Sequence, residues 1–134
     1  MSTSNSYQPI PKDVEQVGKA VLDAAFKVHS ALGPGLLESV YERALTYEIS
    51  KRGKTAKNQV RIPFTYNGKQ LNTDLICDLL VEDCVIVELK AVEKMNPLYE
   101  AQLLTYLKLT GIRLGYLINF NVPQLKSGIK RMVC

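Results

Sequence analysis

The feature that most constrains this chain is a short segment in which charged residues interrupt two strongly apolar runs. From Asp78 to Lys90 the sequence reads DLLVEDCVIVELK. Apolar runs on both sides of the polar Glu82-Asp83 corner predict a hairpin of two short, buried strands. Asp78, Glu88 and Lys90 fall inside these strands. Because buried charge is costly unless it is paired or holds a metal ion, the hairpin must contain one of those two arrangements.

The length of the hairpin loop decides whether the two acids can meet. Glu88 is two residues before Lys90, so the two side chains share one face of their strand. A two-residue loop at Glu82-Asp83 would pair Asp78 with Val87 and point it away from Glu88. Either a bulge or the odd loop 82–84 would instead pair Asp78 with Glu88. We predict one of these two irregularities.

Two carboxylates beside an ammonium group suit a hydrolytic metal site. Mg²⁺ prefers oxygen ligands, and Asp78, Glu88 and a backbone carbonyl near Leu89 would supply them. Such an ion polarises a phosphate and lowers the pKa of a bound water, and Lys90 would orient that water or offset charge on the phosphate. The alternative is a structural ion pair between Lys90 and one of the two acids. A motif this short leaves both interpretations open.

The remaining pattern predicts a mixed sheet flanked by helices. Apolar residues at helical spacing, strand-like alternation and turn signals such as Gly33-Pro34-Gly35 and Asn67-Gly68 divide the chain. The expected helices are 11–32, 36–52 and 97–110, and the expected strands are 55–66, 70–81, 84–92, 114–120 and 129–133. The order helix, helix, three-stranded meander, helix, strand indicates an α/β (α+β) fold in one domain, 11–134, after a disordered lead-in, 1–10. The unit 84–120 is a crossover, so its last strand can pair in parallel.

Composition and charge limit the partners that the protein can have. The chain has 134 residues, 46% of them hydrophobic, and no apolar run approaches the length of a membrane span. Its polar start lacks the apolar core of a signal peptide, so a cytoplasmic protein is expected. The net charge is +4, and basic residues border an acidic centre, which suits a polyanion such as DNA or RNA. We expect the contacts to come from Lys51, Arg52, Lys54, Lys57, Lys126, Lys130 and Arg131. A solvated surface that only maintains solubility is the alternative.

Two helices carry polar residues that could complete the site. Glu38 lies in the first turn of the second helix, where the helix dipole favours a carboxylate, so capping alone would explain it. Gln102 and Tyr106 are one turn apart on the third helix and share a face with apolar residues. A Gln on an apolar face needs a hydrogen-bond partner, and the hairpin carboxylates are candidates.

Three motifs occur together and in order, and they give the chain a specific resemblance. They are Gly35-x-x-Glu38-x-x-Tyr41, Asp78…Glu88-Leu89-Lys90 and Gln102-x-x-x-Tyr106. On these motifs, residues 17–133 resemble the GxxExxY protein family, a branch of the PD-(D/E)xK nuclease-like superfamily. The resemblance implies a restriction-endonuclease-like core, in which helices flank a mixed sheet.

The resemblance also implies roles for individual residues. Asp78 and Glu88 would bind the divalent metal, and Lys90 would assist the attacking water. Glu38 would match an acid that the first core helix often contributes to the metal site. The helix motif of exonuclease-like branches would be matched by Gln102 and Tyr106.

Two positions depart from the superfamily pattern. Cys77 precedes the metal Asp where Pro is nominal, and Ile76 stands where many relatives have Arg. These departures bear on substrate contacts more than on metal binding.

The sequence therefore predicts a Mg²⁺- or Mn²⁺-dependent nuclease that hydrolyses phosphodiester bonds with water. One alternative is a catalytically inactive nuclease-fold module that binds nucleic acid or regulates a partner. Another is a protein-interaction module, for example a homodimer, whose charges form a structural cluster. DNA and RNA, and chain ends and internal sites, are equally compatible with these residues.

Overall fold

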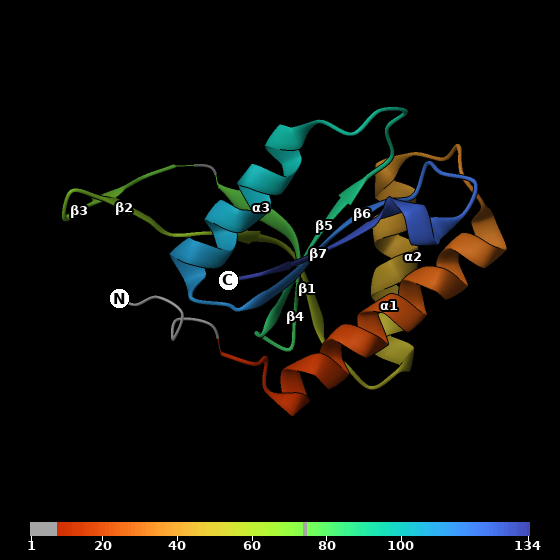
Figure 1. The fold of residues 1–134 in the computed structure, drawn as a ribbon, viewed down its shortest axis with the longest axis horizontal. Coiled ribbons are helices and arrows are strands. Elements are labelled where there is room, and N and C mark those ends of the chain that lie inside the picture. Colours follow the sequence, from red (N-terminus) through yellow and green to blue (C-terminus); the bar gives the residue numbers. More distant parts are fainter. Residues whose placement is uncertain (1–7, 74) are drawn as a thin grey trace.

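A central mixed sheet separates two layers of helices in the computed structural model, which describes residues 8–73 and 75–134 (Figure 1). The sheet has five strands in the order β1-β4-β5-β6-β7. These strands are β1 (Ala56–Arg61), β4 (Ile76–Val81), β5 (Val85–Lys90), β6 (Leu114–Asn119) and β7 (Ile129–Val133). Helices α1 (Lys12–Leu32) and α2 (Glu38–Lys51) lie on one face, and α3 (Pro97–Thr110) lies on the other. A 3-10 turn, η2 (Leu125–Gly128), precedes β7. The predicted mixed α/β architecture is confirmed.

Helix α3 begins and ends at capping residues that the sequence provides. Helix α3 starts at Pro97, after Asn96, whose side chain accepts a hydrogen bond from the Leu98 N–H at 2.9 Å. It ends at Gly111, which adopts the left-handed conformation that glycine tolerates. Helix α1 ends before Gly33. Most of the predicted disordered lead-in, 1–10, lies outside the described residues.

Strand β5 is buried on both faces and joins two apolar cores. Val85, Val87 and Leu89 pack with the buried sides of α1 and α2. Ile86, on the opposite face, packs with the buried side of α3. The alternation follows from the two-residue period of a strand, and it leaves Glu88 on the face that α3 covers.

The hairpin register confirms the odd loop. Val81 pairs with Val85 and Leu79 pairs with Val87, so the loop consists of residues 82–84. Glu82 and Asp83 both adopt positive φ, at 51° and 55°. The crossover through α3 also has the predicted outcome, because β6 pairs with β5 in parallel.

Two of the predicted strands are wrong as continuous elements. The predicted strand 55–66 is divided into β1 and β2 (Phe64–Tyr66), and 70–81 is divided into β3 (Lys69–Leu71) and β4. Pro63 lies at the first break, where it cannot donate a backbone hydrogen bond to the ladder. Strands β2 and β3 form a separate two-stranded sheet around the Asn67-Gly68 turn, and this hairpin projects from the body of the molecule (Figure 1).

Within the described ranges, none of the helices combines the length and the apolar character that a membrane span requires.

Candidate functional site

The two hairpin acids meet across β4 and β5 and bind the opposite backbone. The Asp78 N–H donates to Glu88 Oε2 at 2.7 Å, and the Leu89 N–H donates to Asp78 Oδ2 at 2.8 Å. These bonds continue the hairpin register one residue beyond the Leu79–Val87 pair. Each carboxylate therefore has one oxygen fixed by the backbone and a second oxygen directed elsewhere.

Strand β4 changes face at Asp78. Cys77 packs in the core beneath α3, whereas Leu79 packs in the core beneath α1 and α2. In a regular strand two such residues would share one face. On the neighbouring strand, Gln59 adopts φ of 52° and makes no ladder pair, although it lies opposite Asp78. A left-handed non-glycine residue inside a strand is strained, and such strain is often found at functional sites.

Burial makes the charge on these acids costly. The side chain of Glu88 is 4% exposed. Burial, and then the neighbouring Asp78 carboxylate, raise the pKa of Glu88 to about 8. Burial also raises the pKa of Asp78, against the opposing effect of its hydrogen bond from Leu89. A cation bound between the two groups would remove both penalties.

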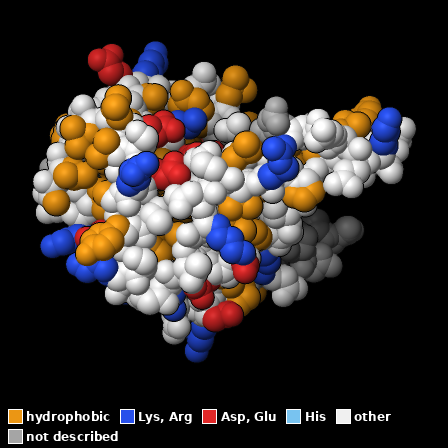
Figure 2. Space-filling view, turned by 180° about the vertical axis from the view of Figure 1, so that it is seen from behind, with side chains coloured by type: hydrophobic (Ala, Val, Ile, Leu, Met, Phe, Trp, Pro, Cys, Tyr) orange, Lys and Arg blue, Asp and Glu red, His pale blue; other side chains and the backbone are white. Residues whose placement is uncertain are grey.

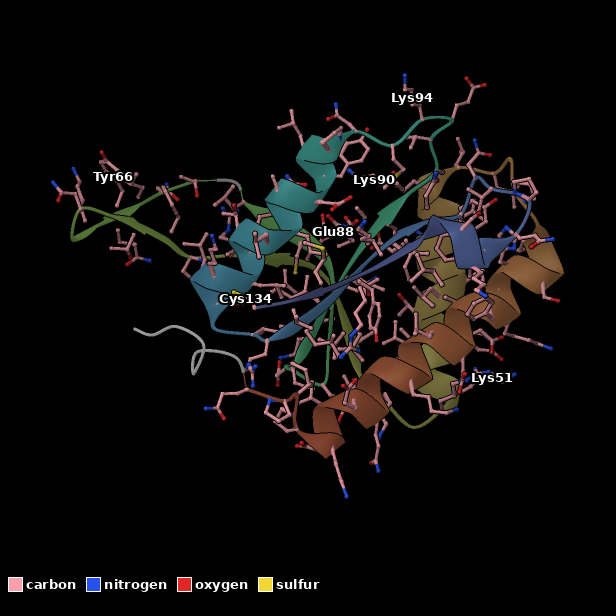
Figure 3. All side chains as sticks on the ribbon, in the orientation of Figure 1. Lys51, Tyr66, Glu88, Lys90, Lys94 and Cys134 are labelled. Carbon is pink, nitrogen blue, oxygen red and sulfur yellow. The ribbon has the colours of Figure 1, made fainter. Side chains whose placement is uncertain are left out.

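Lys90 lies beside the acids without forming an ion pair with them. Its ammonium nitrogen lies over the ring of Tyr99, 4.2 Å from the centroid, which is a cation–π contact. Among described residues no carboxylate oxygen lies within salt-bridge distance of Lys90. Lys90, Tyr99 and Gln102 line a hollow at the first turns of α3. Figure 3 shows Glu88 near the centre of the molecule and Lys90 further along β5.

The start of α2 brings a second pair of acids towards Asp78. Partial burial and then the Asp78 charge raise the pKa of Glu38, which lies in the first turn of α2. Glu42, one turn later, accepts hydrogen bonds from Gln59 Nε2 at 3.0 and 3.2 Å and from Asn58 Nδ2 at 3.0 Å. Gln59 Nε2 also donates to Asp78 Oδ1 at 3.3 Å. The amide of Gln59 thus bridges an acid of α2 and an acid of the hairpin.

Tyr41 holds the turn that precedes Glu38. Its hydroxyl donates to the Gly33 carbonyl at 2.6 Å and accepts from the Leu36 N–H at 3.1 Å. Its ring stacks on Phe120, with centroids 4.6 Å apart and an interplanar angle of 10°. The Tyr of the first motif therefore fixes this loop, in which the motif's Gly35 adopts φ of 100°. The Glu between them lies at the helix start.

The predicted site residues are brought together unequally. Asp78, Glu88 and Lys90 are adjacent, and Tyr106 is buried near Glu88, which together with burial raises the Tyr106 pKa. Gln102 is exposed and, within the described chain, makes no hydrogen bond to the hairpin acids. Among residues 8–73 and 75–134, no set of three or more His, Cys, Asp and Glu side chains has an arrangement that could hold a metal ion. The arrangement offers two carboxylates, and Glu38 acts on them through its charge.

Several of the basic residues expected to bind nucleic acid are paired with acids instead. The pairs are Arg52–Glu48 at 2.8 Å, Lys57–Asp83 at 2.9 Å, Lys130–Glu100 at 3.7 Å and Arg131–Glu15 at 2.8 Å. Lys51 is the last residue of α2, at the end of the helix that is more distant from Glu88 (Figure 3). On the face shown in Figure 2, acidic side chains near the middle have lysine and arginine side chains close to them. The charges expected to form a basic border are thus partly compensated on the surface itself.

The site predicted from the sequence did not include Gln59, Glu42 or Tyr99. Gln59 sits in an apparently regular strand, and a left-handed glutamine has no sequence signal. Glu42 shares the face of Glu38 because it follows four residues later on a helix, so it was accessible to a helical-wheel argument. Tyr99 contacts Lys90 only because the chain crosses from β5 to α3, which depends on tertiary structure.

The comparisons with known proteins agree with this fold. A profile of the PD-(D/E)XK nuclease superfamily matches residues 15–132, which extend from α1 into β7. The chain therefore belongs to the PD-(D/E)XK nuclease superfamily. Its mixed sheet and flanking helices confirm the predicted restriction-endonuclease-like core. No curated protein and no solved structure gives a significant match. The narrower GxxExxY assignment stays a prediction.

Proposed function

We propose that this protein is a divalent-metal-dependent nuclease that hydrolyses phosphodiester bonds in nucleic acid. The observation that carries the proposal is the Asp78–Glu88 pair, in which a half-buried and a buried carboxylate face each other while each keeps one oxygen free of the backbone bond. Membership of the nuclease superfamily supports it independently.

The donor set fits a hard divalent cation. Mg²⁺ and Mn²⁺ take oxygen ligands, and Mg²⁺ commonly binds one or two carboxylates together with waters and substrate phosphates. Asp78 and Glu88 would hold the ion, and Glu38 would add charge from α2. When bound, the ion would polarise the phosphate and lower the pKa of a coordinated water.

The protein residues would supply orientation and charge. The backbone amides of Asp78 and Leu89 fix the carboxylates before any ligand arrives, which reduces the cost of organising the site. Lys90, positioned by Tyr99, would orient the attacking water and offset the negative charge on the phosphate oxygens in the transition state. The attacking water loses a proton to solvent as its oxygen bonds to phosphorus. The bridging P–O bond on the opposite side breaks, and the departing sugar oxygen takes up a proton from solvent.

The test compares substitutions that remove the charge of a site residue but keep the approximate shape of its side chain. Asp78→Asn retains an acceptor for the Leu89 N–H but removes the charge. We expect it to abolish Mn²⁺ binding in calorimetry and the cleavage of labelled DNA and RNA. Lys90→Met keeps an unbranched stem against Tyr99, so it should retain Mn²⁺ binding and lose about 10²-fold or more in cleavage rate.

Asp83→Asn is the matched control, because it makes the same change on the exposed corner of the same hairpin. It should match the wild type in both assays, since it removes only the surface pair with Lys57. A wild-type protein that takes up no Mn²⁺ at millimolar concentration contradicts the metal site. Nucleic-acid binding that persists in every variant without any cleavage would instead indicate the inactive binding module.

A further inference from the structure

The β2–β3 hairpin is an arm with little support from the rest of the molecule. Its two strands pair only with each other, from Phe64–Leu71 to Tyr66–Lys69, and no other described element packs broadly against them. Isolated two-stranded hairpins are marginal in water. The arm extends away from the body in both the ribbon and the space-filling views (Figures 1 and 2).

The tip of the arm presents an aromatic ring beside a cation. Tyr66 is 65% exposed, and its cross-strand partner is the exposed Lys69. Within the described chain, Lys69 forms no salt bridge. No acidic residue occurs between positions 55 and 73. The arm therefore carries positive charge only, whereas several basic residues elsewhere, among them Arg52, Lys130 and Arg131, are paired with acids.

The root of the arm adjoins the acid pair. Strands β1 and β4 continue from the Gln59–Asp78 position to the Arg61–Ile76 pair, and the arm begins directly beyond it. Extended chain from Arg61 to Tyr66 spans at most about 17 Å. Gln59, which contacts Asp78, lies two residues before Arg61, so a nucleic-acid single strand of a few nucleotides is long enough to join the tip of the arm to Asp78.

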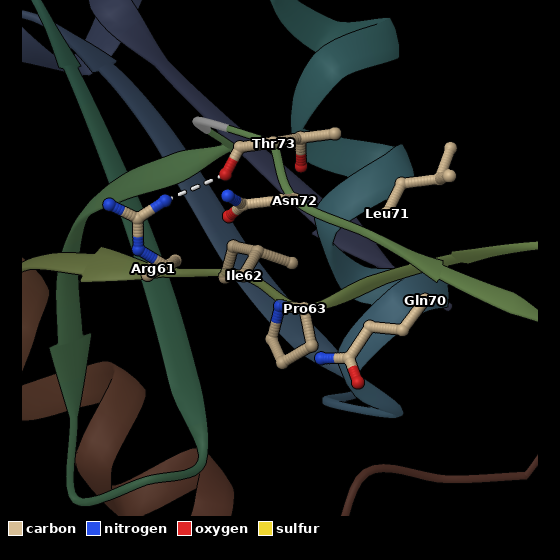
Figure 4. Close-up of a pocket in the computed structure, with 7 residues that line it drawn as sticks. All are labelled: Arg61, Ile62, Pro63, Gln70, Leu71, Asn72 and Thr73. Carbon is tan, nitrogen blue, oxygen red and sulfur yellow. Dashed lines mark hydrogen bonds between the residues drawn. The ribbon is translucent and has the colours of Figure 1, made fainter.

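The root also forms an open pocket with both polar and apolar walls (Figure 4). Its lining includes Gln70, Asn72, Pro63 and Arg61, and the Arg61 guanidinium donates to the Thr73 carbonyl at 2.7 Å. Amide and guanidinium groups can bind base edges, and apolar walls can accept a base face.

We propose that the β2–β3 arm binds single-stranded nucleic acid and directs it to the Asp78–Glu88 site. Tyr66 stacks on an unpaired base, and Lys69 contacts the adjacent phosphate. Stacking of this kind requires an exposed base face, which single strands offer and duplexes do not. The delivery of a strand to the acids rests on the proposed nuclease function. Binding of the strand to the arm does not, so it can be measured separately from hydrolysis.

The experiment measures anisotropy of fluorescein-labelled single-stranded DNA, single-stranded RNA of the same sequence and duplex DNA, all in EDTA. The variant carries Tyr66→Leu and Lys69→Gln. We expect affinity for single strands to fall about tenfold or more, and the slope of log affinity against log salt to become shallower by about one. The variant Tyr66→Phe with Lys69→Arg keeps the ring and the charge, so it should bind like the wild type.

Phe26→Leu with Lys19→Gln is the control, because it removes an exposed ring and an exposed cation from α1. It should leave binding unchanged. Mn²⁺-dependent hydrolysis of bis(p-nitrophenyl) phosphate, which is too small to reach the arm, separates the two proposals. If the arm variant loses single-strand binding but still hydrolyses this small substrate, both proposals are supported. If the arm variant loses single-strand binding and neither it nor the wild type hydrolyses the small substrate, only the arm proposal is supported.

Three results would overturn the arm proposal. The arm variant could bind single strands as the wild type does, or the wild type could bind none. The arm substitutions could also weaken only duplex binding. If the arm substitutions change the sedimentation coefficient of the protein but not its affinity for nucleic acid, the arm is an oligomerisation surface instead.

Discussion

At the scale of single residues, the site depends on one residue with a strained backbone. Gln59 occupies the left-handed region in the middle of β1, and its amide nitrogen donates to both Glu42 and Asp78. A backbone conformation that costs about 1 kcal/mol or more in a non-glycine residue persists where contacts compensate for it. The two carboxylate contacts are the visible compensation.

Gln59→Gly tests this role. Glycine adopts the same φ without strain, so the free energy of unfolding should change by no more than about 1 kcal/mol. Mn²⁺ affinity should fall severalfold, because Asp78 loses a positioning contact. Asn67→Gly relaxes a similar φ of 50° in the arm turn, away from the acids, and should leave Mn²⁺ affinity as in the wild type. Equal affinities for wild type and Gln59→Gly would assign Gln59 no part in the site.

At the scale of elements, the motif around α2 acts as a clamp. Tyr41 binds the Gly33 carbonyl and the Leu36 N–H while its ring packs on Phe120. The hydroxyl therefore joins the end of α1 to the start of α2, which carries Glu38. The Tyr of this motif therefore has a positioning role, and the Glu is the residue whose charge acts on the hairpin acids.

Tyr41→Phe should destabilise the protein by about 1–3 kcal/mol in urea unfolding, because two partly buried backbone groups lose their partner while the ring stays. Tyr47→Phe, on the exposed face of the same helix, should change stability by less than about 0.5 kcal/mol. A Tyr41→Phe protein as stable as the Tyr47→Phe protein would show that the clamp contributes nothing to stability.

Elements also show what sequence reasoning can reach. The odd loop at 82–84 was predictable, because only that register or a bulge brings Asp78 and Glu88 together. Pro63 indicated from the sequence that the strand 55–66 would be irregular. The sequence did not indicate that residues 64–71 would form a separate hairpin, because that depends on where the chain returns to the main sheet. Gln59 was beyond prediction, since nothing in local sequence distinguishes a left-handed glutamine from an extended one.

At the scale of the whole molecule, the buried acids couple stability to pH. The pKa of Glu88 is raised from an ordinary value near 4.5 to about 8. The folded state therefore binds this proton more tightly than the unfolded state, and the associated stability is lost as pH rises through this window. Burial raises the pKa of Asp78 and partial burial raises that of Glu38, so both contribute with the same sign.

In EDTA, the free energy of unfolding should fall by up to about 2 kcal/mol between about pH 5.5 and 7.5. Glu88→Gln should flatten this dependence, whereas Glu93→Gln, at an exposed position, should preserve it. Urea denaturation at several pH values gives the comparison, and added Mn²⁺ should restore stability at the higher pH. A wild-type stability that increases with pH over this range would contradict the raised pKa.

Each hairpin carboxylate accepts a hydrogen bond from the backbone of the opposite strand, so two backbone amides are sensitive to the state of the acids. The N–H groups of Asp78 and Leu89 donate to side-chain oxygens rather than to strand carbonyls. Their exchange rates and chemical shifts should therefore follow the protonation and occupancy of the acids, while amides deeper in the sheet follow global unfolding. Two resonances in a nuclear magnetic resonance spectrum would then register events at the site without any label or substrate.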